Sequence, residues 1–412
     1  MKKFLTSAFL IFVISCNLIF AQDSTSVVPE SSPLIYTFGY NRIPENCNLP
    51  LIGVVNKTQG SHAGIEIGVL NHCRNNFSGL QIGFANLASN NLTGRQIGFL
   101  NTTGNNSTGF ITGFINATGN SANGCQIGFV NAVGDKFRGL EVGFVNATGD
   151  KVYGFQTGFI NATGDKVTGI QTGFINAIGD KMTGIQLGFG NFTGDKVHGF
   201  QTGFLNFTGD KFRGIELGFL NFTGDKFTGM QIGFCNKVHT LSGFQLGFLN
   251  FTDTVEHGIP LGFLTYVKHG GYQAVDVSIS ELFPVNISYK TGTEILYTSI
   301  NASFGADTGH QFAFGLGLGS FIHLSPKLAF NPEFVSQTTL FQSWEQLQSL
   351  KLNFNYQLDQ HFSVFAGPSV TWQHLNSTTS DWLNPFLSVF TVDVNAGNKI
   401  YSGLNAGVRY RF

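Results

Sequence analysis

A tandem repeat of 15 residues fills more than half of this 412-residue chain. Two adjacent units, 154–168 and 169–183, read GFQTGFINATGDKVT and GIQTGFINAIGDKMT. One glycine of each unit recurs without a slip, and an asparagine keeps step with it. These glycines are Gly53, Gly68, Gly83, Gly98, Gly113, Gly128, Gly143, Gly158, Gly173, Gly188, Gly203, Gly218 and Gly233. One residue is then missing, and the pattern resumes at Gly247 before it fades at Gly262. A constant period of this length is typical of stacked repeat architectures.

Within one unit, residue types alternate with a period of two, which indicates a β-strand. Phe155, Thr157 and Phe159 alternate with polar or small residues. Residues 161–165, NATGD, supply turn chemistry, because Gly adopts positive φ freely and Asn or Asp tolerates it. Residues 166–168 form a second extended piece. Each unit is therefore predicted to be a longer strand, a turn and a short strand.

The constancy of the period favours a β-solenoid over residues 49–266, with one 15-residue coil per unit. An extra residue in a solenoid breaks stacking with both neighbouring coils, whereas the loops of a meander tolerate insertions. The asparagine column supports the same reading, because stacked amides form ladders. One large antiparallel meander barrel is the alternative. In the solenoid, the sequence predicts one continuous buried column of aromatic rings, made of Phe159, Phe174, Phe189 and Phe204.

One feature of the unit resists this interpretation. Phe159 and Ile160 are both apolar, yet successive residues of a strand point to opposite faces. Either the strand kinks at Gly158, or the rod carries an outer apolar stripe that something covers. The sequence leaves both explanations open.

Residues 267–412 lack the repeat and are predicted to form a small β-barrel of about eight strands. Leu350, Leu352 and Phe354 alternate with Lys351 and Asn353. Strands with one apolar and one polar face suit a transmembrane barrel, although a soluble sandwich shows the same alternation. The expected strands lie near 274–289, 294–304, 310–324, 327–338, 349–358, 362–374, 383–394 and 403–412. A barrel of this size is filled by side chains, so an anchor is expected rather than a pore.

The last strand ends on Phe412, with Tyr410 two residues before it. This ending resembles the C-terminal signal by which outer-membrane barrels are recognised for assembly. Both ends of an even-stranded barrel lie on one side of the membrane, which would place the repeat array in the periplasm unless it is threaded outward.

The N-terminus is predicted to be a signal peptide, residues 1–21, followed by a lead-in segment, residues 22–48. Lys2 and Lys3 precede an apolar stretch, and Ala21 offers a small residue for cleavage. The residues before Cys16 resemble a lipobox, but the apolar run continues beyond that cysteine. Export directs the chain to the envelope of a Gram-negative cell.

The cysteines outside the signal peptide fall into two pairs of different expectation. An oxidising compartment would permit a disulfide between Cys47 and Cys73, which the sequence does not decide. Cys125 and Cys235 replace apolar residues of the repeat and are expected to be buried free thiols.

Composition excludes several classes of function. The net charge is −1 and only 11% of the residues are charged, which gives no case for nucleic acid binding. No histidine or cysteine cluster has the spacing of a zinc site, and no cofactor is predicted. Glu66, Glu141 and Glu216 occupy a column that otherwise holds Gln, and none has a second carboxylate in the sequence nearby. Catalytic, cofactor-binding and metal-binding residues are therefore all predicted to be absent.

The segments 154–161, GFQTGFIN, and 184–191, GIQLGFGN, resemble the units of bacterial surface repeat-containing proteins, which read close to GLQIGLIN. The resemblance covers residues 49–266 and implies an envelope or surface protein. That family has no assigned activity, so it contributes no site residues. Surface exposure conflicts with the periplasmic array of the simplest barrel topology, and the sequence does not resolve this conflict.

These observations predict a non-enzymatic structural or adhesive protein of the outer membrane. A barrel anchor would carry a repeat rod, whose surface offers many identical contacts to a protein or glycan partner. The alternative is an outer-membrane channel or transport barrel formed by the whole chain.

Overall fold

The computed structural model describes residues 34–305, 312–340, 345–374, 383, 385–395 and 397–412. The predicted signal peptide and the first part of the lead-in segment lie outside these residues. All regular structure in the described residues is β, as predicted. The chain divides into two compact units, one up to Gly218 and one from Phe219 onward.

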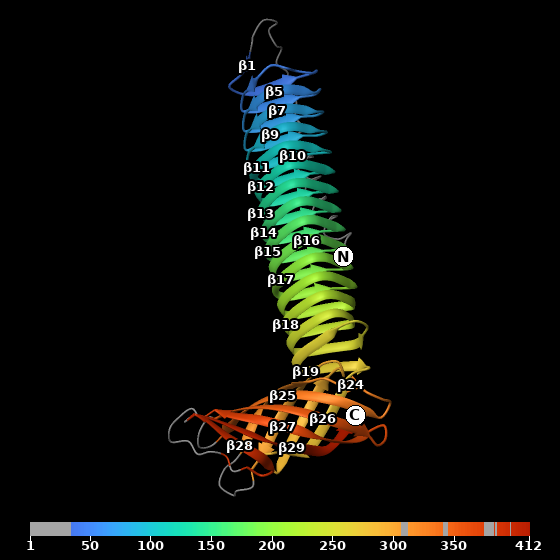
Figure 1. The fold of residues 1–412 in the computed structure, drawn as a ribbon. Helices are drawn as coiled ribbons and strands as arrows, with labels where there is room; N and C mark the ends of the chain where they lie inside the picture. Colours follow the sequence, from blue (N-terminus) through green and yellow to red (C-terminus); the bar gives the residue numbers. More distant parts are fainter. Residues whose placement is uncertain (1–33, 306–311, 341–344, 375–382, 384, 396) are drawn as a thin grey trace. The chain divides into compact units, whose positions relative to one another are not determined.

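One sheet contains the repeats, and it begins at Ile35, before the predicted start of the array. Figure 1 shows its strands stacked coil upon coil within the array. Its strands are β1 (Ile35–Tyr36), β2 (Tyr40–Ile43), β3 (Leu51–Ile52), β4 (Val55–Thr58), β5 (His62–Ile67), β6 (Leu70–Cys73), β7 (Phe77–Ile82), β8 (Ala85–Ala88), β9 (Leu92–Ile97), β10 (Leu100–Thr103), β11 (Ser107–Thr118), β12 (Ser121–Val133), β13 (Lys136–Thr148), β14 (Lys151–Thr163), β15 (Lys166–Ile178), β16 (Lys181–Thr193), β17 (Lys196–Thr208), β18 (Lys211–Val255) and β19 (Ile259–His269).

The strands of this sheet pair in parallel, with equivalent residues of adjacent coils side by side. Between β14 and β15, for example, Gly154 pairs with Gly169 and Asn161 pairs with Asn176. Parallel pairing at the repeat distance confirms the solenoid. The meander alternative is wrong, because a meander requires antiparallel neighbours.

The coil is more continuous than the predicted long strand, turn and short strand. β15 runs from Lys166 to Ile178, and a turn at Gly179 and Asp180 leads to β16. The strand bends within each coil at a glycine of positive φ, such as Gly169 with φ of 140°. A Cβ atom at Gly169 would lie 2.0 Å from the carbonyl oxygen of Gly154, so close stacking of the bends also requires glycine there.

The exposed fractions of the side chains show that the predicted core of the array is wrong. Phe159 is 43% exposed, whereas Gln156 and Asn161 are 1% and 0% exposed. The column of Phe rings is therefore continuous, as predicted, but it lies on the outside of the solenoid. Both explanations left open hold: the chain bends at the glycine before the ring, as at Gly98 and Phe99 in an earlier coil, and the rings form an outer apolar stripe. Apolar interior positions are held instead by a column that includes Phe137, Val152, Val167, Met182 and Val197.

Amide ladders run through the interior and explain why polar side chains can be buried there. Asn161 Nδ2 donates to Asn176 Oδ1 at 2.9 Å and to the carbonyl oxygen of Thr172 at 2.7 Å. The glutamine ladder runs the other way, since Gln171 Nε2 donates to Gln156 Oε1 at 2.7 Å. Stacking one coil on the next thus supplies the hydrogen bonds that buried amides need. This confirms the predicted asparagine ladder.

Every coil stacks on its neighbours in the same way, so the coils on either side of a deleted unit can stack on each other. Deletion of one complete unit, residues 184–198, should therefore leave the array folded. The deletion joins Thr183 to Gly199, which occupies the same position as Gly184. We expect the circular dichroism spectrum per residue to be unchanged and the melting temperature to fall by only a few degrees. Deletion of residues 184–190 is the control. It removes an odd number of residues, so the side chains that follow would point to the opposite face of the strand. Equal loss of structure in both variants would contradict stacked coils.

A second, antiparallel sheet follows the array. Its strands are β20 (Tyr272–Ile279), β21 (Val285–Gly292), β22 (Tyr297–Phe304), β23 (Phe312–Gly319), β24 (Ile322–His323), β25 (Leu328–Leu340), β26 (Gln346–Gln357), β27 (Phe362–His374), β28 (Ser388–Asn395) and β29 (Asn398–Arg411).

Eight of these strands close a barrel, in the order β20, β21, β22, β23, β25, β26, β27 and β29, with β29 returning to pair with β20. The predicted number is confirmed, but the strands differ in detail. The expected strand 274–289 is two strands, because Ser280 to Pro284 turn the chain between β20 and β21. β28 pairs with the first half of β29, while β20 pairs with its second half.

The two faces of the barrel strands are inverted relative to a soluble sandwich. On β26, Leu350 and Phe354 are 46% and 49% exposed, whereas Lys351 and Asn353 are buried. The glycines of β23 face the lumen, and a Cβ atom at Gly319 would lie 2.4 Å from the ring of Tyr297. Glycine at these positions therefore relieves crowding inside the narrow barrel.

Candidate functional surface

The outer stripe of the array forms a regular aromatic ridge. We define the aromatic ridge as Phe84, Phe99, Phe114, Phe129, Phe144, Phe159, Phe174, Phe189 and Phe204. Neighbouring rings have centroids 4.8–5.1 Å apart and planes within 7° of parallel. The rings are 43–59% exposed, so their outer edges reach solvent while their faces stack on one another. In the second unit, Phe219, Phe234, Phe248 and Phe263 stack in the same way.

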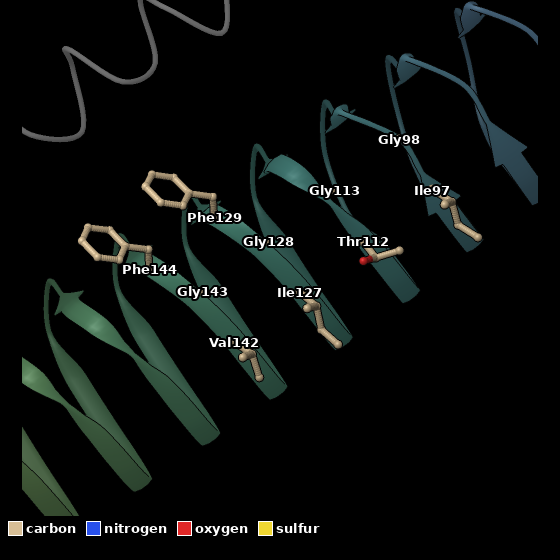
Figure 2. A pocket seen from close by; sticks show the side chains of 10 residues that line it. All are labelled: Ile97, Gly98, Thr112, Gly113, Ile127, Gly128, Phe129, Val142, Gly143 and Phe144. Carbon is tan, nitrogen blue, oxygen red and sulfur yellow. The ribbon is translucent and has the colours of Figure 1, made fainter.

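A shallow groove of about 600 Å³ runs beside the aromatic ridge. We call it the glycine groove, because one glycine per coil forms its floor. Figure 2 shows Phe129 and Phe144 on one side of these glycines and Ile127 and Val142 on the other. The lining residues are Ile97, Gly98, Thr112, Gly113, Ile127, Gly128, Phe129, Val142, Gly143 and Phe144. The lining holds no charged side chain, which limits the ligands that it fits to neutral or apolar ones.

The floor glycines are fixed by the asparagine ladder beneath them. A Cβ atom at Gly143 would lie 2.7 Å from Asn131 Nδ2 and 2.8 Å from Asn146 Oδ1. Any larger residue would displace the buried amides or the stacked backbone, so the asparagine ladder restricts this position of the coil to glycine.

The three glutamates of the Gln column lie in the interior, away from any surface that a substrate reaches. Glu66, Glu141 and Glu216 are each 0% exposed. Gln156 Nε2 donates to Glu141 Oε2 at 2.8 Å, as one glutamine donates to the next elsewhere in the column. Burial raises the pKa of Glu141 from its ordinary value of 4.5 to about 8, and the hydrogen bond from Gln156 opposes this rise. The Glu141 carboxyl therefore takes the place of a glutamine as acceptor in the amide ladder on the Gln156 side.

A buried histidine–glutamate pair was not anticipated from the sequence. His62 Nδ1 lies 2.6 Å from Glu66 Oε1, and His62 Nε2 lies 2.9 Å from the carbonyl oxygen of Leu49. Gln81 Nε2 donates to the other oxygen, Glu66 Oε2, at 2.7 Å. The sequence contained a sign of this pair. His62 stands where most coils have an apolar interior residue, and Glu66, four positions later, stands where most coils have Gln. Both side chains are fully buried, and each satisfies a polar atom of the other in the interior of the early coils.

Charged side chains from four strands meet inside the barrel. Arg409 on β29 makes a bidentate pair with Asp276 on β20, at 2.7 and 2.8 Å. Lys290 on β21 lies 2.7 Å from Asp276 Oδ2 and also pairs with Glu333 on β25. Tyr297 donates to Glu333 Oε1 at 2.7 Å. All five side chains are buried, so the lumen here is filled by a hydrogen-bonded ion network rather than by open space.

Another part of the lumen is filled by an apolar cluster next to a second polar network. The turn between β20 and β21 buries Leu282 and Phe283 against Ala313, Leu347, Leu383 and Tyr401. Beside them, Tyr401 donates to Gln373 Oε1 at 2.9 Å, and Glu281 accepts hydrogen bonds from Ser369 and Thr371. These contacts agree with the predicted filled barrel.

The structure answers one question about the cysteines that the sequence left open, and it corrects the predicted burial of two of them. Cys47 and Cys73 are free and buried, so the disulfide between them is not formed. The thiol of Cys73 instead contacts the carbonyl oxygens of Gly60 and Asn76, at 3.4 and 3.3 Å. Cys125 and Cys235 are free, as predicted, but they are half-buried because their columns face outward.

Two recurring sequence patterns, a column of Thr residues and a series of Asn-x-Thr triplets, place their side chains inside the array. Thr148, Thr163 and Thr193 lie inside the coils, at most 4% exposed, so this column cannot order water at the surface. The asparagines of the Asn-x-Thr sites belong to the buried ladder and are inaccessible as glycan acceptors. They are Asn116, Asn146, Asn161, Asn191, Asn206, Asn221 and Asn250.

Within the described ranges, no group of three or more His, Cys, Asp and Glu side chains could hold a metal ion. Those ranges also contain no helix long and apolar enough to span a membrane. No protein-family model matches the chain, and no curated protein matches it.

Proposed function

We propose that this chain is a non-enzymatic cell-envelope protein whose barrel is a closed outer-membrane anchor and whose coils present a repeating surface to a partner. The observation that carries the proposal is the inversion of the barrel faces. Phe314, Leu316 and Leu318 are 43–46% exposed, whereas the ion pair of Asp276 and Arg409 is buried. Lipid is the solvent that favours apolar side chains outside and polar ones inside.

The filled lumen supports an anchor over a channel. A channel made by the whole chain would need one antiparallel barrel, and the coils pair in parallel instead. The regular aromatic ridge supports a presenting surface, because identical contacts repeated along a rod add through high effective concentration. The GLQIGLIN-like units favour placing the chain among the surface repeat-containing proteins, and this placement is part of the proposal.

The closed anchor predicts that the full chain, reconstituted in planar lipid bilayers, conducts no more than a protein-free bilayer. The ion network and the cluster around Leu282 and Phe283 fill the lumen where they lie, which opposes the passage of ions. Flotation with lipid vesicles and heat-modifiable migration in gels must first show that the barrel has inserted and folded. Stable conductance steps from inserted protein would contradict the anchor, and failure to float would contradict membrane insertion itself.

A further inference from the structure

The aromatic ridge offers ring edges, and this limits what can bind it. Rings such as Phe129 stack between Phe114 and Phe144 with planes 1° and 3° from parallel. Both faces of an internal ring are therefore covered by its neighbours. Cations bind aromatic faces, and a sugar ring that packs on an aromatic side chain also needs an open face. The ridge and its uncharged groove fit an apolar protein surface better than a glycan.

The exposed area of the ridge is large for a surface that stays in water. An aromatic side chain has roughly 150–250 Å² of surface, so nine rings that are 43–59% exposed present about 800 Å². The largest apolar patch on a typical monomer is about 300–600 Å². A stable protein interface buries about 800 Å² on each partner. The ridge alone reaches that size.

The distance between neighbouring rings of the aromatic ridge limits which partner can contact every coil. Its rings repeat every 4.8–5.1 Å, so a partner that contacts every coil must have the same repeat. A second copy of this chain has that repeat by construction. The ridge and the glycine groove lie side by side, so a two-fold axis parallel to the array sets each ridge into the other copy's groove. Such a contact is closed and self-complementary.

We propose that the chain forms a homodimer through its arrays, which run in the same direction with the aromatic ridge of each copy seated in the glycine groove of the other. The proposal specifies the partner of the presenting surface described above, and in that sense it rests on the proposed function. It does not depend on insertion of the barrel into a membrane.

The test is the protein mass of the full chain in detergent, measured by light scattering with the detergent contribution separated. Wild type should have the mass of two chains. The variant F99E/F114E/F129E places three like charges in the contact and should have the mass of one chain. The matched control T93E/T108E/N123E adds three glutamates in neighbouring exposed positions, outside the ridge and groove, and should remain a dimer. Circular dichroism melts check that the variants are folded.

A milder variant keeps the proposal testable if three charges disrupt the coils. F129S removes one ring and should weaken the dimer by about tenfold or more in Kd. A wild-type chain that remains single over the whole concentration range would overturn the proposal, as would a folded F99E/F114E/F129E variant that stays dimeric. A single wild-type chain that binds more detergent than this variant would assign the ridge to lipid, which also overturns it. Vesicle flotation should be equal for all variants, so a failed anchor is distinguished from a failed dimer.

Discussion

Replacing Glu141 with Gln should stabilise the middle of the array by about 5 kcal/mol at pH 9 and hardly at all at pH 4. Oε1 of Glu141 and Oε1 of Gln126 are both buried without a hydrogen-bond partner, on residues that pair between β12 and β13. A proton on the carboxyl supplies the donor that this ladder step lacks, and an ionised carboxylate cannot. The amide of Gln supplies it at every pH.

The sign of the effect follows from the direction of the pKa shift. Folding raises the pKa of Glu141 from 4.5 to about 8. Stability from the neutral carboxyl is fully present below pH 4.5 and is lost as the pH rises through 8. Over that interval the wild type should lose about 1.4 kcal/mol per pH unit relative to E141Q.

Hydrogen exchange read by mass spectrometry, at several pH values, measures this difference for the peptides that contain β12, β13 and β14. E256Q is the control, because Glu256 is exposed and pairs with Lys226 at the surface. Parallel stability curves for wild type and E141Q across pH 5 to 9 would show that Glu141 is not held neutral by the fold.

Removal of Arg409 should destabilise the barrel by about 3–5 kcal/mol, because it leaves buried carboxylates without enough positive charge. In R409M, Lys290 would be left as the ion-pair partner of both Asp276 and Glu333. The double variant D276N/R409M restores one cation to one anion and should recover part of the loss. Denaturant unfolding in detergent, followed by heat-modifiable migration, measures both variants.

Arg411 provides the matched control for the barrel. It pairs with Glu294, and both side chains are about one-third exposed. R411M should therefore cost at most about 1 kcal/mol. If R409M were no more destabilising than R411M, the network in the lumen would not contribute to the stability of the barrel.

Among the features of the sequence, the constant 15-residue period predicted the most about the fold. A step of 15 residues places Gly169 on Gly154 and Asn176 on Asn161, and the structure pairs these residues. Between Asn236 and Asn250 the step is 14 residues, yet the ladder bond still forms at 2.9 Å. In the barrel, the alternation along β26 and β29 predicted these strands. The expected count of eight agrees because the expected strand 274–289 is two strands, whereas the expected strand 383–394 corresponds to β28, which lies outside the closed ring.

Period two alone could not tell which face of the strand is the inside. Alternation of Phe159 with polar neighbours is identical for a buried ring and an exposed one, and hydrophobicity favoured the buried one. The interior is occupied instead by the amide ladders and by a different apolar column, which includes Phe137 and Val152. The error for Cys125 has the same origin, because its column faces outward with the rings.

The sequence by itself determined the repeat, its parallel stacking, the asparagine ladder and the alternating strands of the barrel, because each depends on spacing along the chain. Only the tertiary structure decided what is buried. A buried Asn or Gln is costly in one coil and is satisfied only when the next coil supplies its partner. Likewise, Arg409 and Asp276 are 133 residues apart in the chain and meet only when the barrel closes. Burial of polar groups is a property of neighbours in space, which spacing in one strand does not encode.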